Sequence, residues 1–166
     1  MKLFLLRHAK SNWDPPFQVD FERGLSTRGE KNCILLHEYL QSSEIFFDCI
    51  LASPSKRTKL TLEKAIPKSA HRSKPMFEES LYESSAIEAI SLLQKLEPQF
   101  KRVLIVGHNP SLSELSQVLL QNSAIEDIPT LGFVGLTNST NTWEDFLKSP
   151  CKLEVFWRPR FKHEIG

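Results

Sequence analysis

Residues 3–11 of the chain read LFLLRHAKS, an apolar run followed at once by arginine and histidine. The run Leu3–Leu6 is typical of a strand that is buried on both faces of a sheet. Similar short apolar runs recur at residues 46–51, 103–106, 131–136 and 153–157. We therefore expect a sheet whose strands are spread over the whole chain.

Helix-type patterns separate these runs. A capping-box spacing at residues 27–30 predicts a helix that reaches about residue 40. Ser53 followed by Pro54 predicts an N-cap with proline at the first helical position. Further helices are expected over residues 86–96 and after a second capping-box spacing at 111–114.

Alternation of buried strands with helices predicts an α/β fold, a three-layer α/β/α sandwich with a mostly parallel sheet. The last run has no obvious helix before it, so we expect it at an antiparallel edge. In such sheets ligands bind beyond the carboxyl ends of the strands, which is where the chemistry is expected.

Composition indicates an ordinary globular domain. The chain has 166 residues, of which 40% are hydrophobic and 25% charged, with a formal net charge of +1. This length predicts a single domain, residues 1–166. The near-zero net charge argues against a strongly basic nucleic-acid binder, although a local basic pocket stays open.

Cysteine usage and the apolar runs predict a cytoplasmic protein. Cys33, Cys49 and Cys151 are widely spaced with no CxxC pair, which argues against a disulfide framework and against a four-ligand zinc site. No run approaches the ~18 apolar residues of a membrane span. The run Leu3–Leu6 is also too short for a signal peptide. No membrane association is expected.

Polar signatures follow three of the predicted strands, at residues 7–11, 53–58 and 107–111. Parallel neighbours would bring them to one edge, with Arg7, His8, Arg57 and His108 among them. Arginine binds phosphate through bidentate, charge-assisted hydrogen bonds, and a neutral histidine can attack phosphorus. Taken singly, each of these residues is more often structural than catalytic. Their convergence predicts a phosphate site.

The set resembles the histidine phosphatase superfamily, which contains phosphoglycerate mutases and acid phosphatases. Arg7-His8-Ala9 stands where that family has Arg-His-Gly, and the chain looks most like the small SixA-type phosphohistidine phosphatases. The quoted matches are residues 7–11 with Trp13, 25–29, 53–58 and 107–110. The resemblance implies a phosphoglycerate mutase-like fold.

The resemblance also implies roles. His8 would be the nucleophile, Arg7 and Arg57 would hold the phosphoryl oxygens, and His108 would complete the pocket. Glu83 falls where many members place the proton donor, although an ordinary exposed carboxylate is nearly as good an interpretation. No cofactor and no metal are implied, because the arginines and His108 supply the positive charge.

Two further expectations concern the pocket. Gly24 replaces the proline of the branch pattern, which changes the backbone angles available at the rim near Arg23. Trp13 is expected to line that rim. The nearby cations should lower the pKa of His108 in the empty site, and a bound anion should raise it.

The sequence thus predicts a metal-independent phosphatase that forms a covalent phosphohistidine intermediate. Its expected partners are a phosphorylated protein, with phosphohistidine as the group attacked, or a small phosphorylated molecule; no nucleic acid is expected. A small-molecule phosphomonoesterase and a non-catalytic phosphate-sensing or protein-binding module remain alternatives. A mutase is disfavoured because so short a chain has little to cover the site.

Overall fold

The computed structural model describes residues 1–13, 16–122 and 124–160 of the chain. The end of the predicted single domain, residues 161–166, lies outside them. The strands are β1 (Lys2–Arg7), β2 (Cys49–Ala52), β3 (Met76–Phe77), β4 (Arg102–Gly107), β5 (Phe133–Thr137) and β6 (Lys152–Trp157). The α-helices are α1 (Thr27–Ser42), α2 (Lys56–Ala65), α3 (Ala86–Gln94), α4 (Ser111–Leu120) and α5 (Trp143–Lys148). Three 3-10 turns complete the described elements: η1 (Asp20–Glu22), η2 (Lys68–Ala70) and η3 (Glu79–Leu81).

The described strands form one six-stranded sheet in the order β3-β2-β4-β1-β5-β6. The first four strands of this order pair in parallel, whereas β5 runs antiparallel to β1. The last strand, β6, is an edge and pairs antiparallel with β5, as expected. However, the strand whose direction differs from that of the other five is β5 and not β6. The short helix α5 also precedes β6, where no helix was expected.

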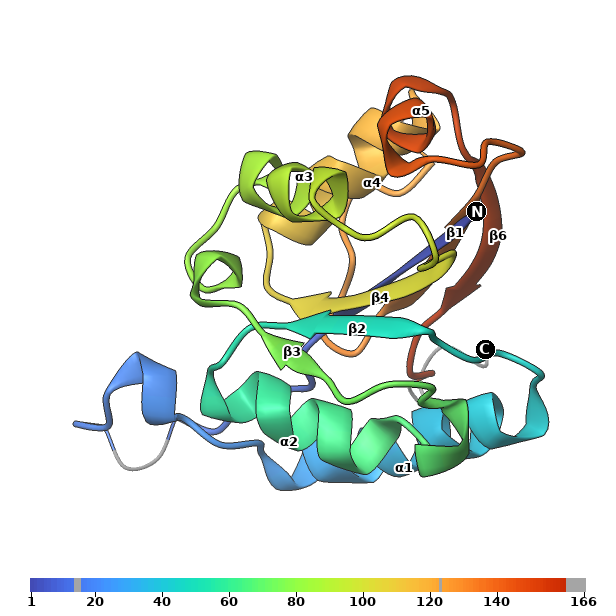
Figure 1. The fold of residues 1–166 in the computed structure, drawn as a ribbon. Coiled ribbons are helices and arrows are strands. Elements are labelled where there is room, and N and C mark those ends of the chain that lie inside the picture. Colours follow the sequence, from blue (N-terminus) through green and yellow to red (C-terminus); the bar gives the residue numbers. More distant parts are fainter. Residues whose placement is uncertain (14–15, 123, 161–166) are drawn as a thin grey trace.

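Helices cover both faces of the sheet, so the predicted three-layer sandwich is confirmed (Figure 1). Helices α1 and α2 pack together on one face, and α3 contacts both α4 and α5 on the other. The sheet residues alternate between two buried clusters accordingly, with Leu3 and Leu5 in one and Phe4 and Leu6 in the other. This alternation buries both faces of β1, and the next residues are Arg7 and His8.

Several predicted boundaries shift by one or two residues. The N-cap of α1 is Ser26, not Thr27, because the Ser26 hydroxyl accepts a hydrogen bond from the Gly29 N–H at 3.0 Å. Helix α2 begins after Ser55, so Pro54 is outside it. Helix α4 begins at Ser111, whose predicted capping role is wrong: its hydroxyl donates to the His108 carbonyl at 2.8 Å.

Two strands are also shorter than their apolar runs. Strand β2 begins at Cys49, because the Phe47 N–H instead donates to the Ala70 carbonyl outside the sheet. Strand β5 begins at Phe133, because Leu131 adopts a left-handed backbone with φ of 59°. The Leu131 N–H donates to the carbonyls of Arg7 and His8, so this turn holds the segment after β1.

Gly29 fixes where α1 begins relative to the same segment. A Cβ atom at Gly29 would lie 2.3 Å from the Lys10 carbonyl oxygen, so only glycine allows this approach. The Ser26 N–H donates to that carbonyl at 2.8 Å. The first turn of α1 therefore packs directly on the loop that follows His8.

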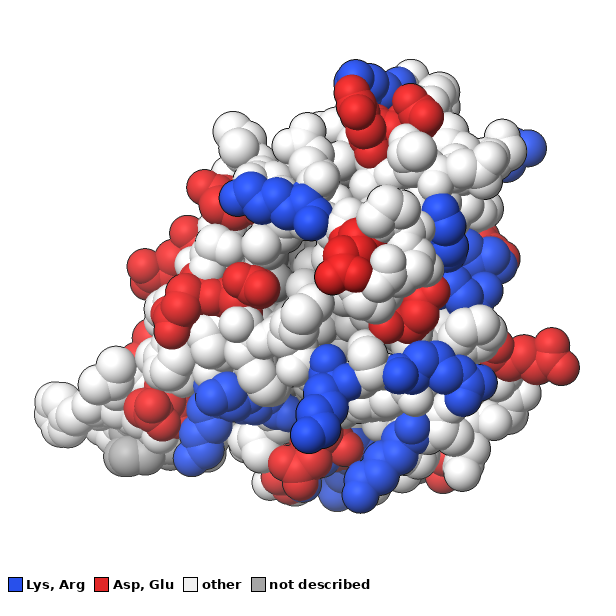
Figure 2. Space-filling model, viewed as in Figure 1, with Lys and Arg blue, Asp and Glu red and all other residues white. Residues whose placement is uncertain are grey.

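Lys and Arg side chains gather on the lower part of the face shown in Figure 2, with Asp and Glu side chains among them. This mixture agrees with the small net charge of +1. Among the described helices, none has both the length and the apolar character that crossing a bilayer requires.

Candidate active site

The carboxyl ends of β1, β2 and β4 bring together Arg7, His8, Arg57 and His108, as the sequence predicted. Arg7 ends β1 and His8 follows it, His108 follows β4, and Arg57 lies in the first turn of α2. The His8 N–H donates to the Gly107 carbonyl at 3.1 Å, which continues the β1–β4 pairing to the site. We call these four residues the floor of the site.

Hydrogen bonds fix the protonation state of the His8 ring. Its Nδ1 lies 2.8 Å from the Ala9 carbonyl, which can only accept, so Nδ1 carries the proton. The Arg57 Nε–H donates to His8 Nε2 at 3.4 Å. The lone pair of Nε2 therefore faces the guanidinium group, where an anion would bind.

One hydroxyl joins the His8 loop to the helix that carries Arg57. Thr61 Oγ1 accepts a hydrogen bond from the Ala9 N–H at 2.9 Å and donates to the Arg57 carbonyl at 2.7 Å. Thr61 is fully buried. The Thr61 hydroxyl thus joins the main chain beside His8 to the main chain of Arg57, which fixes the distance between the two segments.

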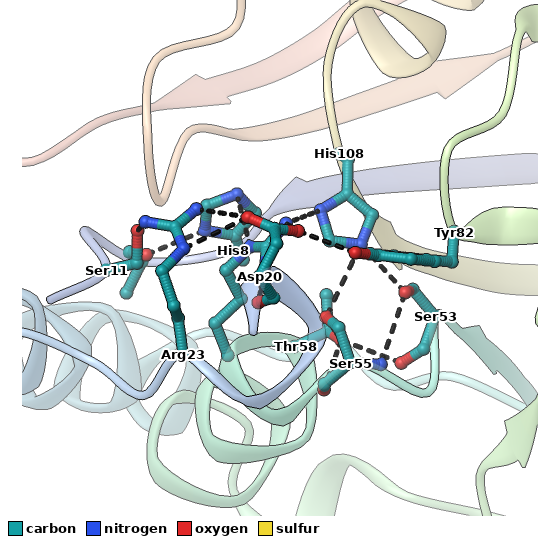
Figure 3. Close-up of polar contacts among 11 residues, drawn as sticks. His8, Ser11, Asp20, Arg23, Ser53, Ser55, Thr58, Tyr82 and His108 are labelled. Atoms are coloured by element: carbon teal, nitrogen blue, oxygen red, sulfur yellow. Dashed lines mark hydrogen bonds and ion pairs between the residues drawn. The ribbon is translucent and has the colours of Figure 1, made fainter. Parts of the chain in front are cut away.

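The His108 ring is oriented in the opposite sense. Arg57 Nη2 lies 3.4 Å from His108 Nδ1, which accepts because a guanidinium can only donate. His108 Nε2 lies 2.7 Å from the Ser53 hydroxyl and carries the proton. The two imidazole rings have centroids 5.1 Å apart, so both border one small volume (Figure 3).

Both rings are neutral at physiological pH. Burial, followed by the charges of Arg57 and Arg7, lowers the pKa of His8 to about 4, against the effect of the Ala9 carbonyl. Burial and the neighbouring His8 and Arg57 lower the pKa of His108 to about 3. The expected direction for His108 is confirmed, but burial is a larger cause than the cations.

Arg7 borders the site with a buried donor unused. Its Nη1 donates to the Ile128 carbonyl at 2.9 Å and lies 3.7 Å from the Asp127 carboxylate. Its Nε is buried and has no hydrogen-bond partner among the described residues. A buried N–H without an acceptor is rare in proteins, and a bound anion would supply one.

A second set of residues surrounds the floor, and we call Asp20, Arg23, Tyr82 and Glu83 the rim. Asp20 lies in η1 and Tyr82 directly follows η3. Asp20 Oδ1 accepts from Arg23 Nε at 3.0 Å and Nη2 at 2.8 Å, and Oδ2 accepts from the Tyr82 hydroxyl at 2.6 Å. Figure 3 shows Asp20 between Arg23 and Tyr82, over His8.

The sequence reasoning missed Asp20 and Tyr82 altogether. Asp20 is only one of several acidic residues in a polar stretch, and no strand ends there to mark it. Burial opposes its ionisation, but hydrogen bonds from Tyr82 and Arg23 and the charge of Arg57 lower its pKa to about 2. The same contact raises the pKa of Tyr82 to about 12.

Glu83 is exposed and has a left-handed backbone with φ of 51°. Among the described residues it makes no hydrogen bond or ion pair with the floor. Gly24 has neither a positive φ nor a crowded position, since an added Cβ would meet only side chains at 3.8 Å and beyond. Trp13 lies beside the rim as expected, with the Arg23 guanidinium 3.7 Å from its ring centroid.

The described residues contain no group of three or more His, Cys, Asp or Glu side chains arranged to hold a metal ion. The positive charge beside His8 comes from arginine side chains. Such an arrangement can bind a phosphoryl group and present a histidine nucleophile to it.

Comparisons with solved structures show the same fold. The SixA protein of Agrobacterium tumefaciens superimposes with a TM-score of 0.80, at 23% identity, covering 96% of this chain and 98% of that one. A protein histidine phosphatase SixA complexed with tungstate gives 0.77 at 21% identity, covering 94% and 96%. At these identities the likeness concerns the fold.

Sequence relatives cover different parts of the chain. An uncharacterized protein of Mycobacterium leprae is 25% identical over 93% of this chain and 100% of its own length. Phosphoserine phosphatase 1 of Hydrogenobacter thermophilus is 43% identical over 63 residues, 37% of this chain and 29% of that protein. The family model of the histidine phosphatase superfamily (branch 1) matches residues 3–88, which include Arg7, His8 and Arg57. The chain therefore belongs to the histidine phosphatase superfamily and is a phosphatase.

Proposed function

We propose that this chain is a metal-independent phosphatase that transfers a phosphoryl group to His8 Nε2 and then to water. The observation that carries the proposal is the unprotonated Nε2 of His8 facing the Arg57 guanidinium. The buried Arg7 Nε without an acceptor supports the same anion site. Two phosphatases with this fold have been solved in complex with tungstate and with vanadate, which are oxyanions like phosphate.

In the first step the Nε2 lone pair of His8 forms an N–P bond while the bond from phosphorus to the leaving group breaks. An alkoxide leaving group takes its proton from a carboxylic acid, for which we propose Glu83, whereas the imidazole of a phosphohistidine leaves already protonated. Arg57, Arg7 and His108 hold the phosphoryl oxygens, which carry the charge in a loose transition state. Water then attacks phosphorus, the N–P bond breaks, and inorganic phosphate and neutral His8 are released.

The rim favours phosphohistidine on a protein as the substrate. An alkoxide leaves poorly without an acid, whereas the protonated imidazole of phosphohistidine leaves readily. Glu83 is exposed and would reach only a leaving group that extends out of the floor. We propose Glu83 as the donor for such groups, which keeps small phosphomonoesters as the second candidate substrates.

Hydrolysis of a phosphohistidine-bearing protein and of para-nitrophenyl phosphate, both measured in EDTA, tests the proposal. We expect His8→Ala to lose at least about 10³-fold in kcat/KM on both substrates, because the nucleophile is gone. His37→Ala, a histidine in the second half of α1, is the matched control and should retain full activity. Equal rates for the wild type and His8→Ala would overturn the proposal, and so would complete loss of activity in EDTA.

A further inference from the structure

Asp20 occupies the side of Arg57 that an incoming phosphoryl group needs. Arg57 Nη2 donates to Asp20 Oδ2 at 3.1 Å, and Nη1 donates to the Asp20 main-chain carbonyl at 2.9 Å. The remaining contacts of this guanidinium are with the two histidines, through Nε to His8 and Nη2 to His108. These contacts use four of the five N–H groups of Arg57, and among the described residues the fifth, on Nη1, is left for another acceptor.

A phosphoryl group therefore cannot bind Arg57 in a bidentate way while Asp20 holds its present position. The carboxylate offers what a phosphoryl group would offer, two oxygens and negative charge, to Arg57, Arg23 and Tyr82 together. We propose that Asp20 is a built-in competitor of phosphate, whose carboxylate closes the empty site and is displaced from Arg57 when the substrate binds. This inference rests on the proposed function, because it assumes that the phosphoryl group binds at Arg57.

The position of Asp20 allows such an exchange. Its side chain is 48% exposed and none of the residues of η1 is buried, so the main apolar contact that a movement of this turn would disturb is that of the Phe21 ring with the Tyr82 ring. Arg23 is held separately by its Nη1 bond to the Ser11 hydroxyl at 2.8 Å and can keep the displaced carboxylate. Repulsion between the carboxylate and a dianion drives the carboxylate away from the bound substrate.

The exchange has a direct consequence for turnover. Inorganic phosphate leaves the site as Asp20 returns to Arg57, so the tethered carboxylate lowers the affinity for the product. Asp20 is then a residue that sets phosphate affinity and release. A residue that only orders Arg57 would act in the opposite direction, because its loss would weaken phosphate binding.

Calorimetric titration of the full chain with inorganic phosphate distinguishes these roles without any turnover. Asp20→Asn keeps the shape and an acceptor for Arg23 but removes the charge. We expect its Kd for phosphate to fall about twofold to fivefold, the size typical of partly exposed ion pairs. An unchanged or higher Kd would overturn the inference.

Two variants control the measurement. Asp127→Asn also removes a carboxylate near a floor arginine, but Asp127 lies 3.7 Å from Arg7, is 69% exposed and leaves Arg57 alone. It should change the Kd by less than Asp20→Asn, and an equal effect would mean that only overall charge matters.

Tyr82→Phe removes a hydrogen bond to Asp20 and keeps the ring on His108, so it should also tighten phosphate binding. If Asp20→Asn fails to fold, a weaker or unchanged affinity in Tyr82→Phe overturns the inference.

The outcomes also separate this inference from the proposed function. His8-dependent hydrolysis with no tightening in Asp20→Asn would remove the role of Asp20 alone. Tightening in Asp20→Asn without any hydrolysis by the wild type would support the competitor and remove the phosphatase mechanism.

Discussion

The floor and the rim of the site are built in different ways. Floor residues follow strand ends that are hydrogen-bonded to one another, and His8, Arg57 and His108 are 8%, 6% and 7% exposed. In the rim, Asp20 and Tyr82 lie at single 3-10 turns and the Asp20 side chain is 48% exposed, whereas Arg23 is 8% exposed, like the floor residues. Under the proposed function, the floor meets the phosphoryl group that all substrates share, and the rim meets the part of the substrate that differs between them.

Replacing one arginine from each part gives the sharpest test of this division. Arg57→Ala should lower kcat/KM by about 10²–10³-fold, as expected for a donor that stabilises transition-state charge. Arg23→Ala should cost about tenfold or less, mainly in KM, since Arg23 holds Asp20 rather than the floor. Steady-state kinetics on para-nitrophenyl phosphate measures both. Losses of equal size would show that floor and rim do not differ in this way.

As the pH falls, the fold should first lose stability because the floor histidines take up protons on unfolding, and only at lower pH because Asp20 of the rim is protonated. Because the native pKa of His8 is about 4 and the unfolded value about 6.5, the unfolded chain binds more protons between these values, and stability falls as pH drops below 6.5. We expect a loss of about 2 kcal/mol for His8 between pH 7.5 and pH 5, measured by urea unfolding. His108 should add a similar loss.

The rim contributes in a lower pH window. The pKa of Asp20 is about 2 in the folded chain against 3.8 ordinarily, so its contribution is lost only as pH falls below about 4. The double variant His8→Gln/His108→Gln should therefore flatten the pH dependence between 7.5 and 5, whereas Asp20→Asn should not. An unaltered slope in the double variant would contradict the assignment.

The smallest expected effect concerns Glu83. Glu83→Gln should lower hydrolysis of an alkyl phosphate about tenfold more than hydrolysis of phosphohistidine, because only the alkoxide needs a proton donor. The ratio of the two kcat/KM values is the measurement. A ratio equal to that of the wild type would leave Glu83 as a surface carboxylate.

The sequence predicted the floor because strand ends are visible in it. Apolar runs mark the strands, and the parallel order of β1, β4 and β2 then places Arg7, His8, Arg57 and His108 at one edge. Asp20 could not be found in this way, since its place depends on contacts with Arg23, Arg57 and Tyr82 that are distant in the chain or carry no periodic pattern.

Helix starts and strand ends were predicted less well for a related reason. Ser26 and Thr27 are both good N-caps, and the choice between them depends on the Lys10 carbonyl, which holds Ser26 through its N–H. The start of β5 likewise depends on the left-handed backbone at Leu131, whose N–H donates to the carbonyls of Arg7 and His8. A local sequence pattern does not predict these boundaries, because the hydrogen-bond partners that set them are distant in the chain.

The main-chain carbonyl of Ala9 has a consequence for how this site can evolve. The group that sets the tautomer of His8 belongs to the polypeptide backbone, and no amino-acid replacement deletes it. In sites where a carboxylate orients the histidine, a single codon change can reverse the tautomer. Here position 9 holds alanine in place of the glycine of the Arg-His-Gly motif, and its carbonyl still lies against Nδ1, so that under the proposed function Nε2 is the attacking nitrogen.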